Sequence, residues 1–121
     1  MSVKLDSFTA GYVEALICDV QGYHDDDNNT PYKDKTESDI APETWESIKA
    51  TCDAFIDEHW DRIAGAHNAA GIDFWLTRNR NGAGFWDGDW NEPDASIMTE
   101  YSHKFGEVSP YVGDDGLIYL F

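Results

Sequence analysis

The segment from Pro42 to about His67 carries the clearest secondary-structure signal in the chain. Its large apolar residues recur at steps of three and four, which is the spacing of one face of an α-helix. Pro42 suits the first turn of a helix, and Gly65 or Gly71 suits its end. The pattern predicts an amphipathic helix that packs one side against a core. The apolar face comprises Trp45, Ile48, Cys52, Ile56, His59 and Ile63.

Two further helices and a terminal hairpin are predicted from the same kind of evidence. Apolar residues at four-residue steps indicate a helix over 6–20, and a similar stripe indicates one from residue 93 or 94 to 105. Gly11 weakens the first of these helices but is tolerated where a neighbouring element packs closely. The segments 108–112 and 117–121, joined by the turn Gly-Asp-Asp-Gly, indicate a hairpin at the end of the chain.

Aromatic and branched residues dominate the segment after Gly71. The stretch 73–78 is typical of a strand, 79–82 supplies turn residues, and 83–86 is typical of a return strand. The predicted order of elements is then ααββαββ, without the alternation that a parallel sheet requires. We therefore expect an α+β fold in which three helices pack on an antiparallel sheet of about four strands. At 121 residues, the chain is expected to form a single domain over 1–121.

The segment 21–41 lacks the apolar repeat and is expected to be a long acidic loop, of a length that is often functional. Its oxygen-bearing side chains match positions 1, 3, 5, 9 and 12 of a calcium-binding EF-hand loop. Pro31 occupies the position where that loop requires glycine, and the flanks do not predict two paired helices. No cofactor is therefore expected, and a Ca²⁺ ion is the alternative. Its ligands would be Asp26, Asn28, Thr30, Asp34 and Glu37.

The charge of the chain excludes several kinds of partner. Acidic residues outnumber basic ones by 24 to 8, so the formal net charge is −16. Phosphates would be repelled, and direct binding to nucleic acid or to an anionic membrane is not expected. No apolar run approaches the ~20 residues of a membrane span, and the N-terminus does not resemble a signal peptide. Cys18 and Cys52 are too few for a disulfide framework, which favours a reducing compartment.

The acidic residues of the segment 42–67 form a candidate binding surface. Asp53, Asp57 and Asp61 follow one another at four-residue steps, about 6 Å apart along a helix, and lie with Glu46 opposite the apolar face. Such a row can imitate a line of backbone phosphates and occupy the nucleic-acid-binding groove of another protein. Two alternatives stay open. The row can be an ordinary solvated helix face, or the excess of Asp can be an adaptation to high salt.

The predicted hairpin over 73–86 is a second candidate binding surface. It brings arginines and large aromatic rings together, and exposed Trp and Arg are typical of the centres of protein interfaces. The alternative is that the rings build a small core and that the arginines pair with acidic residues. The candidate partner-binding residues of this hairpin are Trp75, Arg78, Arg80 and Trp86.

Three stretches of the chain are distinctive: DFWLTRNRNGAGFWD at 73–87, YVGDDGLIY at 111–119 and SFTAGYVEAL at 7–16. Together they resemble a group of uncharacterised small proteins of bacteriophages and prophages. The resemblance covers about half of the chain and implies no catalytic residue. It implies a phage or mobile-element origin and action in the cytoplasm of a bacterial host.

These observations favour a binding protein over an enzyme, because no His, Ser or Cys lies in an active-site motif. We expect a phage-encoded accessory protein that binds a host protein through an acidic surface, as a DNA mimic that inhibits a defence or repair factor. One alternative is a small enzyme or ligand-binding domain that uses the aromatic hairpin and the acidic loop, with a divalent cation. Another alternative is a structural or assembly protein of the virion. The sequence leaves the oligomeric state open.

Overall fold

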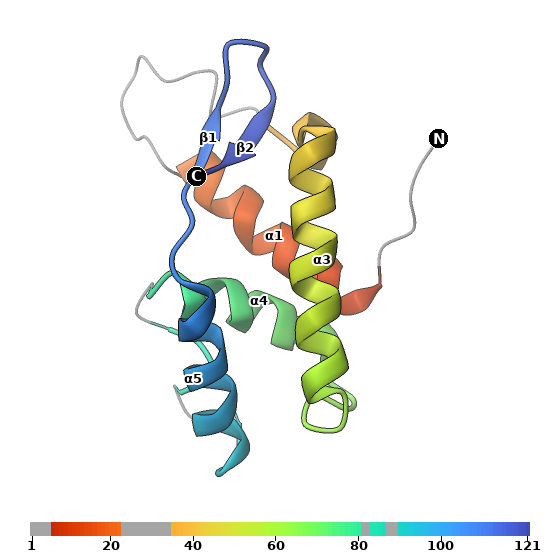
Figure 1. Ribbon diagram of the computed structural model, residues 1–121, viewed down its shortest axis with the longest axis vertical. Coiled ribbons are helices and arrows are strands. Elements are labelled where there is room, and N and C mark those ends of the chain that lie inside the picture. Colours follow the sequence, from red (N-terminus) through yellow and green to blue (C-terminus); the bar gives the residue numbers. More distant parts are fainter. Residues whose placement is uncertain (1–5, 23–34, 81–82, 87–89) are drawn as a thin grey trace.

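The structure is a computed structural model of the chain, and residues 6–22, 35–80, 83–86 and 90–121 are described. Within these ranges the chain forms four α-helices, one short 3-10 helix and one pair of strands (Figure 1). The α-helices are α1 (Ser7–Gly22), α3 (Pro42–His59), α4 (His67–Arg78) and α5 (Asp94–Phe105). The 3-10 helix is η1 (Glu37–Asp39), and the antiparallel strands are β1 (Pro110–Val112) and β2 (Ile118–Leu120).

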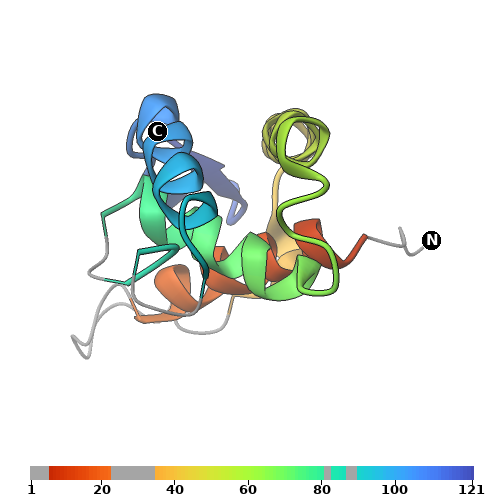
Figure 2. The same ribbon diagram turned by 90° about the horizontal axis from the view of Figure 1, so that it is seen from below.

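The helices lie in two layers. Helices α1 and α4 form one layer, and α3 and α5 both lie on the same side of it (Figure 2). The contact between α1 and α4 depends on two glycines. A Cβ atom at Gly11 would lie 2.1 Å from the carbonyl oxygen of Asn68, and one at Gly71 would lie 1.9 Å from that of Phe8. Only residues without a side chain fit there, and α4 is the closely packed neighbour beside which Gly11 is tolerated.

The core fills the space between the two layers. The ring of Phe55 on α3 is near its centre, with ring centroids 4.9 Å from Phe8, 4.5 Å from Phe74 and 5.6 Å from Phe85. Every α-helix contributes fully buried apolar side chains to this core. They include Phe8, Tyr12 and Leu16 of α1, Ile48, Cys52 and Phe55 of α3, Phe74 and Trp75 of α4, and Met98 of α5.

The terminal hairpin attaches to the start of α3. Ile118 of β2 is fully buried, and its carbonyl oxygen accepts hydrogen bonds from the backbone N–H of Ala41 (3.1 Å) and from the hydroxyl of Thr44 (2.9 Å). The strands pair with Tyr111 opposite Tyr119. The sequence-based prediction of this hairpin is confirmed. The helices predicted over 6–20 and from residue 93 or 94 to 105 are confirmed as well, and the structure has them at Ser7–Gly22 and Asp94–Phe105.

The prediction of a hairpin over 73–86 is wrong. Residues 67–78 form α4, and its buried residues follow helical steps: Ala70 and Gly71, Phe74 and Trp75, Thr77 and Arg78. The aromatic composition reflects burial between α1, α3 and α5 rather than strand structure. Beyond the helix, the predicted return strand at 83–86 is a turn. This turn contacts α4 through a 3.1 Å hydrogen bond from the Phe85 N–H to the Thr77 hydroxyl.

The helix predicted to reach His67 ends earlier, at His59. The chain reverses direction over 60–66, where Gly65 has a φ of +82°, and it then enters α4. The predicted fold class is therefore wrong. Instead of three helices on a sheet of about four strands in the order ααββαββ, the described residues form four α-helices and a two-stranded antiparallel sheet.

Replacing Gly71 with Ala is expected to destabilise the protein by about 3 kcal/mol. In an ordinary exposed helix position the same change is stabilising by up to about 1 kcal/mol, because Gly is a poor helix former. Here the methyl group would overlap the backbone of α1. Urea unfolding followed by circular dichroism measures the difference.

The control is Gly22→Ala at the end of α1, where a Cβ atom would have no neighbour within 4 Å. Its free energy of unfolding is expected to change by less than about 0.5 kcal/mol. Equal stability of the Gly71→Ala variant and the unmodified protein would contradict the close contact of α1 and α4.

Candidate functional site

The acidic row occupies the solvent side of α3. Glu46, Asp53 and Asp57 are exposed on the helix, and Asp61 is exposed in the turn that follows it. Asp53 forms a 3.1 Å ion pair with Lys49, one helical turn away, and both side chains are more than half exposed. Such a pair contributes little to stability. Among the described residues, Glu46, Asp57 and Asp61 have no ion pair, so most of the row carries uncompensated charge.

A cleft lies at the C-terminal end of this row, between the end of α3 and the start of α5. It has a volume of about 340 Å³, and we call it the Trp60 cleft. Trp60 is 58% exposed, and its ring meets that of His67 edge to face at 4.7 Å. The cleft therefore combines an accessible aromatic ring with acidic side chains. Its lining residues are Asp57, Glu58, Trp60, Asp61, Arg62 and Asp94.

One guanidinium group already lies in the Trp60 cleft. Arg62 Nε lies 3.4 Å from Asp94 Oδ1, which is an ion-pair distance without the alignment of a hydrogen bond. Arg62 Nη1 lies 3.2 Å from His59 Nδ1. Arg62 thereby links the end of α3 to the start of α5 and leaves Asp57, Glu58 and Asp61 without a cationic partner among the described residues.

His59 is the buried titratable group behind the cleft. Its ring packs between Phe55 (4.6 Å) and Tyr101 of α5 (4.4 Å), and 2% of the residue is exposed. Because a guanidinium only donates, His59 Nδ1 accepts from Arg62 and the ring proton belongs on Nε2. Burial and the adjacent charge of Arg62 lower the pKa of His59 below its ordinary value. The buried Nε2 has no hydrogen-bond partner among the residues described.

Two of the four predicted hairpin residues lie in the core. Trp75 is fully buried, and its indole N–H donates to Asp19 Oδ2. Arg78 is 6% exposed and donates to the Tyr12 hydroxyl (3.0 Å) and to the backbone carbonyls of Gly106 (3.0 Å) and Phe105 (3.2 Å). Neither side chain is available to a partner in this structure. They hold α4 against α1 and against the end of α5.

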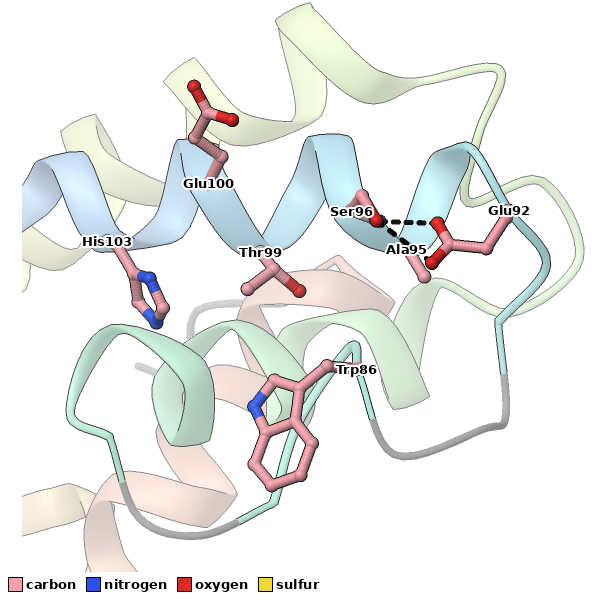
Figure 3. A pocket seen from close by; sticks show the side chains of 7 residues that line it. All are labelled: Trp86, Glu92, Ala95, Ser96, Thr99, Glu100 and His103. Carbon is pink, nitrogen blue, oxygen red and sulfur yellow. Dashed lines mark hydrogen bonds between the residues drawn. The ribbon is translucent and has the colours of Figure 1, made fainter.

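The other two hairpin residues lie apart from the acidic row. Arg80 is at the end of α4, 3.9 Å from Glu107 Oε2, and Trp86 is 52% exposed beside α5. Trp86 borders a second pocket of about 280 Å³ with Thr99 and His103 (Figure 3). Figure 3 shows Thr99 and His103 on the side of α5 that faces Trp86, whereas Glu100 points away from it. The Trp86 pocket and the Trp60 cleft are thus lined by different residues.

The candidate calcium ligands are mostly outside the described residues. Asp26, Asn28, Thr30 and Asp34 fall in the undescribed range 23–34, and Glu37 is the first residue of η1. Among the residues that the structure describes, no three His, Cys, Asp or Glu side chains are grouped so that they could hold a metal ion. Of the two cysteines, Cys18 is exposed and Cys52 is buried. Burial raises the pKa of the Cys52 thiol to about 12, so it is not an activated nucleophile.

Trp60 is not among the candidate binding residues that the sequence predicts. Trp60 flanks the apolar face of its helix, and the helical repeat alone does not show whether it packs or projects. The signal in the sequence is Gly65, which can end the helix before His67 and so leave Trp60 close to a turn.

Lowering the pH from 7.5 to 5.5 is expected to destabilise the protein through His59. Its folded-state pKa is depressed, so below pH 6.5 the unfolded chain binds a proton that the folded chain resists. The contribution of His59 to the free energy of unfolding is therefore fully present above pH 6.5. It is lost as the pH falls from there through the depressed pKa of His59 in the folded protein. The loss over this interval is up to about 1 kcal/mol.

The measurement is urea unfolding at both pH values, for the unmodified protein and for His59→Gln, which cannot take up the proton. The variant is expected to show a smaller pH dependence in this interval. An identical pH dependence of the two proteins would contradict the assignment of a depressed pKa to His59.

Comparisons of the chain with protein-family models, with curated protein sequences and with solved structures find no match. Within the described part of the chain, no helix is both long enough and apolar enough to cross a membrane. The chemistry of the acidic row and of the Trp60 cleft is therefore the basis on which a function is assigned to this protein.

Proposed function

We propose that this protein binds a basic protein partner through the acidic row of α3 and the Trp60 cleft at its end. The observation that carries the proposal is the combination of uncompensated carboxylates with an accessible indole on one continuous stretch, 46–61. Asp57 and Asp61 belong to both the row and the cleft. Charge supplies attraction at long range, and a partly exposed aromatic ring supplies the apolar contact that protein interfaces need at their centre.

The electrostatic field of the whole molecule supports the same partner. A net charge of −16 attracts basic surfaces and accelerates their association, and salt weakens this attraction. Glu46, Asp53 and Asp57 of the acidic row lie on a helix of 18 residues, which is anchored in the core through Ile48, Cys52 and Phe55. Because the helix is fixed, the carboxylates keep their spacing when a partner approaches. Little conformational entropy of the backbone is therefore lost on binding.

In the bacteriophage setting that the sequence resemblance implies, the partner is a host protein with a basic nucleic-acid-binding groove. The protein then acts in the bacterial cytoplasm as an inhibitor. It occupies the groove as a mimic of nucleic acid and so blocks a defence or repair factor. A groove that binds phosphates through Lys and Arg offers the complementary charge for a line of carboxylates.

Adaptation to salt is the competing explanation of the acidity, and it predicts that the position of a carboxylate does not matter. The structure provides variants that separate the two explanations. The first variant removes three carboxylates of the acidic row through the substitutions Asp53→Asn, Asp57→Asn and Asp61→Asn. The matched control removes three exposed carboxylates elsewhere, in Glu14→Gln of α1, Glu100→Gln of α5 and Asp114→Asn of the terminal turn. Both variants have the same net charge.

The row variant is expected to lose at least ten-fold in affinity for basic proteins that the immobilised protein retains from a bacterial lysate at low salt. Three charge contacts of about 0.5 kcal/mol or more each account for a loss of that size. The control variant is expected to change affinity less than three-fold. Retained proteins are identified by mass spectrometry, and their affinities are measured after purification.

Equal losses in the two variants would show that only net charge matters and would contradict the proposal. Retention that persists at high salt would also contradict it, because binding through exposed carboxylates weakens as counterions screen them.

A further inference from the structure

We propose that the Trp60 cleft receives the side chain of an arginine residue from the basic partner. The inference rests on the proposed function and specifies its central contact: the guanidinium stacks on the indole of Trp60 while carboxylates of the cleft bind its N–H groups. It is argued from the exposure of Trp60, from the charges that line the cleft and from the guanidinium that the cleft already holds.

The indole of Trp60 is suited to a cation. Tryptophan is the aromatic side chain that attracts cations most strongly, through the negative potential of its ring face. At 58% exposure, a large part of the indole is accessible, and its described ring contact is the edge-to-face one with His67. Trp60 also follows directly after the last residue of α3, so the ring borders the cleft rather than the helix–helix contacts of the core.

The charge of the cleft selects against anions and in favour of cations. Four carboxylates line it, from Asp57, Glu58, Asp61 and Asp94, against the single guanidinium of Arg62. Arg62 approaches Asp94, so the carboxylates of Asp57, Glu58 and Asp61 are left for an incoming cation. A phosphate or a carboxylate ligand would meet net repulsion at this position.

Arginine fits this environment better than lysine. Its guanidinium is planar, so it lies flat on an indole, and its N–H groups form a fork that binds carboxylates in the ring plane. A lysine ammonium is a compact, strongly hydrated charge that cannot do both at once. The cleft already holds one guanidinium, that of Arg62, whose Nε lies 3.4 Å from Asp94 Oδ1 and whose Nη1 lies 3.2 Å from His59 Nδ1, so its lining accommodates this group.

The experiment compares two synthetic peptides of equal length and charge, one with three Gly-Arg repeats and one with three Gly-Lys repeats. Isothermal titration at low salt is expected to show that the arginine peptide binds about three-fold more tightly, the effect of one exposed cation–π contact. Trp60→Leu is expected to abolish this preference while leaving the weaker, charge-driven binding of both peptides. Trp86→Leu is the matched control, since Trp86 is similarly exposed but lies at the other pocket.

The position of binding is measured by NMR of the tryptophan indole N–H groups, with Trp60 assigned from the Trp60→Leu variant. The arginine peptide is expected to shift the Trp60 resonance. The Trp75 and Trp90 indoles, which donate to Asp19 and Asp73, are internal references and are expected to stay in place.

Failure of this inference and failure of the proposed function give different results. One outcome is that both peptides bind equally, that Trp60→Leu has no effect and that only the row variant weakens binding. This outcome overturns the arginine contact and leaves the proposed role of the acidic row in place. If neither peptide binds at low salt, both are overturned. A peptide-induced shift at another tryptophan with none at Trp60 also overturns the arginine contact.

Discussion

The contact between the backbones of α1 and α4 determines the arrangement of the rest of the molecule. Gly11 and Gly71 allow the two helices to approach so closely that a methyl group on either glycine would overlap the backbone of the opposite helix. With α4 held there, Phe74 and Trp75 enter the core, where Phe74 packs against Phe55 of α3. The short connection from His59 to His67 then has to turn sharply, and this places Trp60 at an exposed corner between two helices.

Arg78 completes this arrangement at the other end of α4. Its guanidinium lies over the rings of Phe74 (6.0 Å) and Phe105 (5.4 Å) and donates to the Tyr12 hydroxyl and to two carbonyls at the end of α5. Carbonyl oxygens at the end of a helix are acceptors without partners within the helix, and they carry the negative end of its dipole. A buried positive charge is thus stabilised by carbonyl dipoles and ring faces. This role in the fold explains why arginine and aromatic residues occur together in the stretch 73–86.

The sequence was sufficient to predict elements whose evidence is local. The helices at 7–22 and 94–105, the start of α3 and the terminal hairpin follow from apolar spacing and turn residues, and all are confirmed. The solvent-facing position of Asp53 and Asp57 follows from the same helical repeat. The stretch 73–78 was misassigned because its aromatic residues favour strands locally. Its helical repeat becomes visible only when Ala70 and Gly71 are included, and the reason for a glycine there is a contact with a distant helix.

The acidic row and the Trp60 cleft are proposed as the contact surface for a basic protein. Hydrogen–deuterium exchange of the protein, alone and in complex with a basic protein retained at low salt, measures which residues the partner covers. Protection on binding is expected to be concentrated in residues 46–62 and at the start of α5 around Asp94. Protection that is concentrated instead on β1 and β2, or on the residues around Trp86 and His103, would contradict it.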